Sequence, residues 1–241
     1  MNLKDKVVLI TGSNQGLGKA LAKKLAERGS KVILIARREN LLKEVKDEIV
    51  KSGGVANYFV CDIRDGKEVK QTIKEVVNKY RNIDILVNNA GVWTDDELEQ
   101  KKPESRKNAF DTNVLGQIQV TEEVLPHLNK EESLIFNTIS TAGVPDLPSG
   151  NNLLWKSYGA SKWGMVGYTQ ALRESLRETN TQVIQYFPGG FESNLYENAG
   201  RENPHNQPWM MNTEDVVDII LFALTRPKDV YIEKIVVSKK K

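Results

Sequence analysis

The chain is poor in the residues that build disulfides and metal sites. Its 241 residues include one cysteine, Cys61, and two histidines, His127 and His205. A single cysteine excludes an internal disulfide framework, and two imidazoles are too few for us to expect a zinc site. The sequence therefore predicts a protein without a structural or catalytic metal.

Long apolar runs and an excess of one charge are also missing. No run approaches the roughly 20 apolar residues of a membrane span, and none near the first residue resembles a signal peptide. The 34 Lys and Arg residues nearly balance the 32 Asp and Glu residues, which gives no indication of nucleic-acid or membrane-surface binding. With 39% hydrophobic and 27% charged residues, we expect a soluble, cytoplasmic protein.

Apolar runs of strand length alternate with longer helical patterns. Strands apolar along their whole length, separated by helices, indicate a parallel sheet covered on both faces. The predicted fold class is α/β, one doubly wound Rossmann-type domain over residues 1–241 with about seven strands. We predict strands at 7–10, 32–35, 55–60, 83–87, 133–139, 182–187 and 230–237, and helices at 17–28, 40–50 and around 69–77.

Residues 189–212 differ from this alternation, because they are rich in glycine and proline and have weak periodicity. A loop of this length in a compact domain usually has a function. This one follows the carboxyl end of a strand, where such folds bind ligands. We expect it to form a lid over a substrate.

A glycine-rich segment with the spacing Gly-x-x-x-Gly-x-Gly lies between the first strand and the first helix. Glycines there allow a tight turn and let a pyrophosphate approach the free N–H groups of the helix. This spacing differs from the Gly-x-Gly-x-x-Gly of the usual dinucleotide-binding motif. The prediction of nucleotide binding therefore depends largely on the position of the segment after the first strand. The residues expected to bind a dinucleotide are Gly12, Ser13, Asn14, Gln15, Gly16, Leu17 and Gly18.

The second strand leads into Arg37 and Arg38, where NAD-type folds usually carry a carboxylate for the adenosine ribose. Without that acid nothing repels a 2′-phosphate, and a guanidinium pairs well with one. We therefore expect NADP(H) to be preferred over NAD(H). The alternative is that both arginines are only solvated at a helix start, and Gln15 adds no support for the NADP(H) preference.

Two further strand ends are expected to meet the same ligand. In a doubly wound sheet, strands one and four flank the point where the strand order reverses, so the turn at 88–91 should face the glycine-rich segment. The alternative for this turn is that its asparagines are simply good turn formers. The additional residues expected to bind the cofactor are Asp62, Ile63, Asn89, Ala90 and Gly91.

Tyr158 and Lys162 stand four residues apart, which places them on one face of a helix. A cation beside a phenol favours the phenolate and lowers a pKa that starts near about 10. The pair therefore predicts a tyrosine that exchanges a proton near neutral pH. The alternative is an ordinary exposed helix face.

Together these features resemble the short-chain dehydrogenase/reductase family over nearly the whole chain, and within it the NADP-dependent carbonyl and hydroxy-acid reductases. Their order and intervals make the resemblance specific. The motifs that carry it are Thr11-Gly12-x-x-x-Gly16-x-Gly18, Asp62, Asn88-Asn89-Ala90-Gly91, Asn113, Ser140, Tyr158-x-x-x-Lys162 and Pro188-Gly189.

The resemblance implies a catalytic role for four residues. Tyr158 would exchange a proton with the substrate oxygen while hydride moves to or from the nicotinamide. Lys162 would lower the pKa of Tyr158 and hold the nicotinamide ribose. Ser140 would hydrogen-bond the carbonyl oxygen, and Asn113 would help to hold a proton-relay water.

The chain departs from the family pattern in two places. The interval between Ser140 and Tyr158 is longer than usual, with the extra residues in a loop at 144–152, so Ser149 is a weak alternative to Ser140. Ser193 replaces a frequent threonine after Pro188 and Gly189, a change that keeps the hydroxyl. Pro188, Gly189 and Ser193 are expected to bind the nicotinamide end of the cofactor.

Aromatic residues suggest the kind of substrate. Trp93, Trp155, Tyr196 and Trp209 lie in segments expected near the pocket mouth, which favours a small apolar or aromatic carbonyl compound. The alternative is that they pack the lid. No arginine is obviously placed to clamp a substrate carboxylate, although Arg201 in the lid could serve.

The predicted function is therefore NADPH-dependent hydride transfer between the nicotinamide and a carbonyl or secondary alcohol. We expect a homodimer or homotetramer, formed through the helices that carry Asn113 and Tyr158. One alternative is an NADP(H)-sensing protein without turnover, which would not need Ser140, Tyr158 and Lys162 together. The other is a nucleotide-sugar epimerase or dehydratase, which would need more sequence after Lys162.

Overall fold

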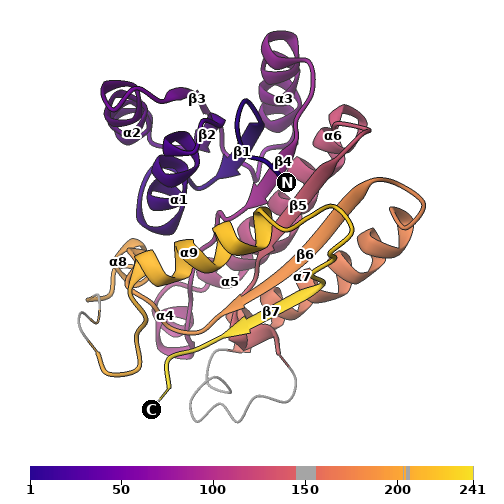
Figure 1. The fold of residues 1–241 in the computed structure, drawn as a ribbon. Helices are drawn as coiled ribbons and strands as arrows, with labels where there is room; N and C mark the ends of the chain where they lie inside the picture. Colours follow the sequence, from indigo (N-terminus) through magenta and orange to yellow (C-terminus); the bar gives the residue numbers. More distant parts are fainter. Residues whose placement is uncertain (145–155, 203, 205–206, 241) are drawn as a thin grey trace.

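The protein is a seven-stranded parallel sheet between two layers of helices (Figure 1). The computed structural model describes residues 1–144, 156–202, 204 and 207–240. The strand order is β3-β2-β1-β4-β5-β6-β7, as expected for a doubly wound sheet. The strands are β1 (Val7–Thr11), β2 (Lys31–Ala36), β3 (Val55–Val60), β4 (Ile85–Asn88), β5 (Ser133–Thr138), β6 (Thr181–Pro188) and β7 (Lys234–Val237).

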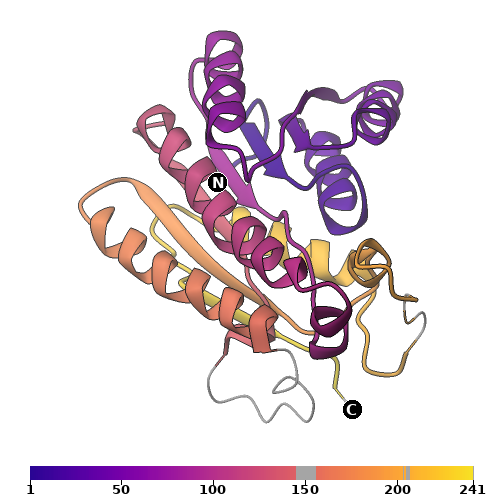
Figure 2. The same ribbon diagram turned by 180° about the vertical axis from the view of Figure 1, so that it is seen from behind.

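Helices cover both faces of the sheet (Figures 1 and 2). One layer contains α1 (Gly16–Glu27), α2 (Glu39–Lys51) and α9 (Thr213–Leu224), and the opposite layer contains α3 (Gly66–Tyr80), α6 (Gln117–Val124) and α7 (Lys156–Ser175). The short helices at the edge of the cleft described below are α4 (Asp96–Lys101), α5 (Glu104–Phe110) and α8 (Leu195–Asn198). Single-turn helices, one π and two 3₁₀, are η1 (Asp111–Gly116), η2 (Leu125–His127) and η3 (Thr141–Gly143).

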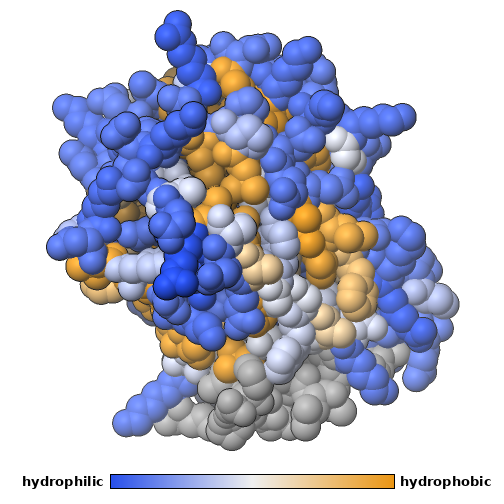
Figure 3. Space-filling model, turned by 90° about the vertical axis from the view of Figure 1, so that its right-hand side faces the viewer, coloured by the Kyte–Doolittle hydropathy of each residue, from blue (hydrophilic) through white to orange (hydrophobic). Residues whose placement is uncertain are grey.

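The last strand is shorter than predicted. A strand was expected over 230–237, but β7 begins at Lys234. Before it, the Tyr231 hydroxyl bonds to the backbone of Val183 in β6, so a side chain occupies the place of the backbone ladder. Strand β7 lies at one edge of the sheet. Figure 3 shows one side of the molecule, where apolar surface lies between hydrophilic areas.

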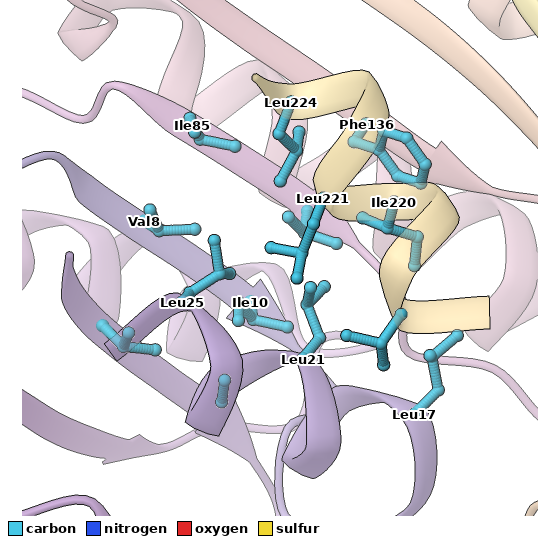
Figure 4. Packing of buried hydrophobic residues seen from close by; sticks show 14 of the residues in the cluster. Val8, Ile10, Leu17, Leu21, Leu25, Ile85, Phe136, Ile220, Leu221 and Leu224 are labelled. Carbon is cyan, nitrogen blue, oxygen red and sulfur yellow. The ribbon is translucent and has the colours of Figure 1, made fainter. Parts of the chain in front are cut away.

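The two faces of each strand pack into different cores. Val8 and Ile10 of β1 point to the layer of α1 and α9, where they meet Leu21 and Leu221, whereas Leu9 points to the layer of α3 and α6 (Figure 4). Because successive side chains of a strand point to opposite faces, a sheet covered on both sides needs strands that are apolar throughout. This explains the continuous apolar runs and confirms the predicted fold class.

The strand order reverses between β1 and β4. Connections leave these two strands in opposite directions, so a crevice opens beyond their carboxyl ends. The segment 189–212, which follows β6, includes α8 and is anchored by a bridge between Phe191 and Met211. Within the described ranges, no helix has the length and apolar character to cross a membrane.

Candidate active site

A cleft of about 920 Å³ opens at the carboxyl ends of the strands. It is lined by nearly all of the predicted site residues that the structure describes. Two do not line it: Ser13 is buried and its hydroxyl accepts a hydrogen bond from Ile35 N in β2 at 2.9 Å, and Asn113 lies behind the wall. Trp155 and Ser149 fall outside the described residues.

The glycine-rich segment and the turn at 88–91 contact each other closely and are joined by hydrogen bonds, as expected from the strand order. Asn89 Nδ2 donates to the carbonyl oxygens of Thr11 and Gly12 at 3.0 and 3.3 Å. A Cβ on Gly12, whose φ is +67°, would lie 2.8 Å from Ala90 Cα, and one on Gly18 would lie 2.4 Å from Gly12 O. Only glycine therefore allows this close approach.

The same loop fits a dinucleotide. No side chain caps the N-terminus of α1 at Gln15, so its first N–H groups are available for a pyrophosphate. Gly12 precedes this terminus and Gly18 lies in the first turn of α1; neither has a side chain that would fill the space beside the terminus. The residues present thus fit the phosphates of NAD(P).

Basic residues surround the adenosine end of the cleft. Arg37 and Arg38 both line it. Arg38 bonds to the Gln15 side chain, and the Asn14 amide oxygen, in the orientation that satisfies its neighbours, accepts from Arg38 Nε and Nη2 at 3.1 and 3.0 Å. Gln15, which offered no support in the sequence, therefore helps to orient a guanidinium.

Asp62 is engaged by an arginine that the sequence did not single out. Arg64 Nε lies 2.9 and 3.0 Å from the two Asp62 carboxylate oxygens, and these bonds lower the pKa of Asp62. Arg64 Nη1 also donates to Asn108 at 2.8 Å. Arg64 thus offsets the charge of Asp62 at the end of the cleft where we expect the adenosine. The sequence signal for it was an arginine two residues after the acid.

Tyr158 and Lys162 are buried on α7, with Lys162 Nζ 5.6 Å from the centroid of the Tyr158 ring. Burial raises the pKa of Tyr158 to about 12, partly offset by a hydrogen bond with the Ser140 hydroxyl. Burial also lowers the pKa of Lys162 to about 8. In this structure burial therefore raises the pKa of Tyr158, opposite to the lowering that we expected from Lys162.

Ser140 follows β5 and starts the short helix η3. Its hydroxyl accepts a hydrogen bond from Ala142 N at 3.1 Å and makes the bond to Tyr158. The hydroxyl and the phenol therefore converge on one point of the cleft, despite the long interval between them in the sequence.

Asn113 joins the two halves of the site from behind. It lies in the π-helical turn η1, a distortion that is frequent at functional sites. Its Nδ2 donates to Val92 O at 2.9 Å and to Ser161 Oγ at 3.0 Å, and its Oδ1 accepts from Val92 N at 2.8 Å. Ser161, which the sequence did not single out, donates in turn to the Tyr158 carbonyl oxygen at 2.7 Å.

Aromatic residues form the wall beside Tyr158. The Trp93 and Tyr196 rings lie 4.6 Å apart between centroids, at 49°, and pack in one cluster with Tyr158. Trp209 also lines the cleft and packs on Gly190, where an added Cβ would lie 2.2 Å from the ring. Trp93, Tyr196 and Trp209 therefore line the cleft that contains Tyr158, and their contact with a substrate stays a prediction.

Two residues of the segment 189–212 were misjudged or missed. Arg201, considered as a clamp for a substrate carboxylate, is not part of the cleft wall and pairs with Asp95 and Glu97. Asn194 was missed, although its Oδ1 would lie 3.7 Å from a Cβ on Gly16. The segment therefore reaches the glycine-rich loop.

Comparisons with known proteins agree with this arrangement. Residues 6–204 match the family described as short chain dehydrogenase. A 3-oxoacyl-[acyl-carrier-protein] reductase of Thermotoga maritima is 34% identical over 202 residues, which cover 82% of this chain and 78% of the relative. A metagenomic short-chain oxidoreductase in complex with NADP is similar with a TM-score of 0.82 and 26% identity over 100% of both chains.

Serine dehydrogenase from Escherichia coli has a TM-score of 0.79 and 29% identity, over 96% of this chain and 97% of its own. The family match covers far more than half of the chain and includes the glycine-rich loop, Tyr158 and Lys162. The chain therefore belongs to the short-chain dehydrogenase family of oxidoreductases.

Proposed function

We propose that the protein is an NADPH-dependent oxidoreductase that transfers a hydride between the nicotinamide and the carbonyl or secondary alcohol of a small substrate. The observation that carries this proposal is the convergence of the Ser140 hydroxyl and the Tyr158 phenol at one end of a cleft. The other end of that cleft is a glycine cradle before a helix N-terminus.

NADPH would lie along the cleft. The glycine-rich loop would hold the pyrophosphate, and Arg37 and Arg38 would pair with the 2′-phosphate. Asp62, Ile63 and the turn at 88–91 would contact the adenosine side, whereas Pro188, Gly189 and Ser193 would contact the nicotinamide side. Bound NADPH supplies the hydride, and in the reverse direction NADP⁺ accepts it.

The protein's own residues handle the proton. With its pKa raised to about 12, Tyr158 carries its proton at neutral pH and is a donor to the substrate oxygen. The Ser140 hydroxyl donates a second hydrogen bond to that oxygen, and the bond strengthens as negative charge develops. Lys162 would hold the nicotinamide ribose, and Asn113 would anchor the segment after β4 to α7.

An apolar or aromatic carbonyl compound fits the substrate end. Its wall beside Tyr158 is formed by Trp93 and Tyr196, and residues 189–212 would form the lid over it. By their names, the relatives given above are a 3-oxoacyl-[acyl-carrier-protein] reductase and a serine dehydrogenase. Both names describe oxidoreductases.

The protein would assemble as a homodimer or homotetramer. Phe110, Leu115 and Trp163 are each at least 40% exposed and lie on α5, η1 and α7, the elements around Asn113 and Tyr158. Large exposed apolar side chains on three elements that pack together favour contact with another protein surface. Size-exclusion chromatography with light scattering measures the state, and a monomer at micromolar concentration would contradict this part.

NADPH-consumption kinetics over a panel of aldehydes, ketones, diketones, keto acids and semialdehydes test the proposed reaction. Turnover that is lost in Tyr158→Phe, with NADPH affinity kept within a few fold, is the expected result, since the ring stays and only the acid is removed. NADPH binding without turnover on any of these classes would instead favour a nucleotide sensor.

A further inference from the structure

The lid meets the segment after β4 at two neighbouring places. The Tyr196 ring of the lid packs on the Trp93 ring. Five residues further along the lid, Arg201 Nη2 lies 3.1 and 3.2 Å from the two carboxylate oxygens of Asp95, and 2.9 Å from Glu97 Oε2. An aromatic contact and a charged contact thus join the same two segments.

Arg201 and Asp95 are each held in place by further bonds. Arg201 N donates to Tyr196 O at 2.9 Å, so the guanidinium and the aromatic ring belong to one compact turn of the lid. Asp95 caps helix α4 by accepting from Leu98 N at 2.6 Å. Because both partners are pre-oriented, the pair loses less side-chain entropy than an ordinary surface pair.

The exposed fractions support a contact stronger than a solvated ion pair. The Arg201 and Asp95 side chains are 28% and 22% exposed, whereas the Arg177 and Glu174 side chains of an ion pair at the end of α7 are 72% and 75% exposed. Partly buried charges that share several hydrogen bonds are screened less by solvent. The two pairs therefore form a natural comparison within one chain.

The aromatic contact beneath Arg201 is part of the site. Trp93 and Tyr196 share one buried cluster with Tyr158, and all three line the cleft. The position of Tyr196 against Trp93 consequently sets the wall beside the proton donor. Any movement of the lid away from residues 93–97 opens that wall.

We propose that Arg201 is a positioning residue for substrate binding. Its ion pairs with Asp95 and Glu97 hold the lid against residues 93–97, a contact that we call the latch. The latch keeps the Tyr196 ring against the Trp93 ring and so forms the wall beside the substrate. The proposal rests on the proposed function, in which Tyr158 delivers the proton to a substrate bound against this wall. Tyr158 and Ser140 line the cleft and Arg201 is not part of its wall, so the effect of Arg201 falls on substrate affinity rather than on the chemical step.

Kinetics and amide hydrogen exchange of Arg201→Gln and Asp95→Asn test the latch. Asparagine keeps the helix cap and removes the charge, so Asp95→Asn remains folded even if Arg201→Gln does not. We expect KM for the carbonyl substrate to rise about five- to tenfold, with kcat and NADPH affinity within about twofold of the wild type. Arg201→Lys should recover part of the loss, and 0.5 M salt should raise KM of the wild type.

Hydrogen exchange separates this proposal from the proposed function, because it needs no turnover. Both variants should exchange faster in peptides covering 93–98 and 195–201, and elsewhere as the wild type does. The control Arg177→Gln should change neither KM nor exchange in these peptides. Unchanged exchange in both variants would overturn the latch, whatever the kinetics show, whereas a wild-type enzyme without turnover would overturn only the proposed reaction.

Discussion

Lys162 Nζ lies 5.6 Å from the centroid of the Tyr158 ring, and both residues are only 5% exposed. Burial opposes charge on either group, so the pKa of Lys162 falls to about 8 while that of Tyr158 rises to about 12. Keeping Lys162 charged near neutral pH therefore lowers the stability of the fold.

Replacing Lys162 by methionine should stabilise the fold while abolishing turnover. The pKa of Lys162 is lowered from 10.5 to about 8, so the stability that its neutral form contributes is present above pH 10.5 and lost as pH falls through about 8. At pH 7 the variant should gain on the order of 2–3 kcal/mol in the free energy of unfolding. Urea denaturation at pH 7 and pH 10 measures this, and a gain of equal size at both pH values would contradict the reasoning.

Ser140→Ala should slow reduction by on the order of 10²-fold, because it removes a donor to the developing oxyanion. It also removes the hydrogen bond that lowers the pKa of Tyr158, which weakens the phenol as an acid. Steady-state kcat at saturating NADPH measures the loss. Thr141→Ala, which removes the adjacent hydroxyl of the cleft wall, is the control, and equal effects of the two substitutions would remove the special role of Ser140.

Arg38→Ala should weaken NADPH binding by about 1.5–3 kcal/mol and leave NADH binding nearly unchanged, since a charge-assisted contact to the 2′-phosphate is lost. Asn14 and Gln15 orient this guanidinium in the structure. Titration calorimetry with both cofactors measures the difference. If NADPH and NADH weakened alike, Arg38 would support the loop rather than select the cofactor.

Gly18→Ala should destabilise the fold by on the order of 2–3 kcal/mol and weaken cofactor binding. Its Cβ would lie 2.4 Å from Gly12 O and 2.7 Å from Asn89 Nδ2, so backbone atoms would have to move. Gly167→Ala on α7 is the matched control, because a Cβ there meets nothing within 4 Å; it should be neutral or stabilise the helix by up to about 1 kcal/mol. Thermal unfolding with and without NADPH compares the two variants, and similar losses would contradict the steric argument.

Sequence patterns predicted the elements well where the signal was long and buried. The buried strand β1 was expected at 7–10 and spans Val7–Thr11, and the buried strand β2 was expected at 32–35 and spans Lys31–Ala36. Prediction failed at β7, where the Tyr231 side chain bonds to the backbone of Val183 and the strand begins only at Lys234. The other edge strand, β3, has the predicted bounds, so the difference comes from this side-chain contact and not from the edge position alone.

The site was predicted in the same uneven way. The spacing of Tyr158 and Lys162 on one helix and the glycines after β1 are local properties, visible without a fold. Ser161, Arg64 and Asn194 gave no comparable signal, because each gains its place by meeting a residue distant in the chain or by the shape of a loop.

The sequence by itself determined the alternating α/β order, the glycine cradle, the residues that share a helix face and hence the family. Only the tertiary structure decided the protonation of the buried pair, the partners of Arg201 and the wall beside Tyr158. The physical reason is that periodicity and spacing act within a few residues, whereas burial changes the solvation of a charge and joins segments about a hundred residues apart, such as Asp95 and Arg201.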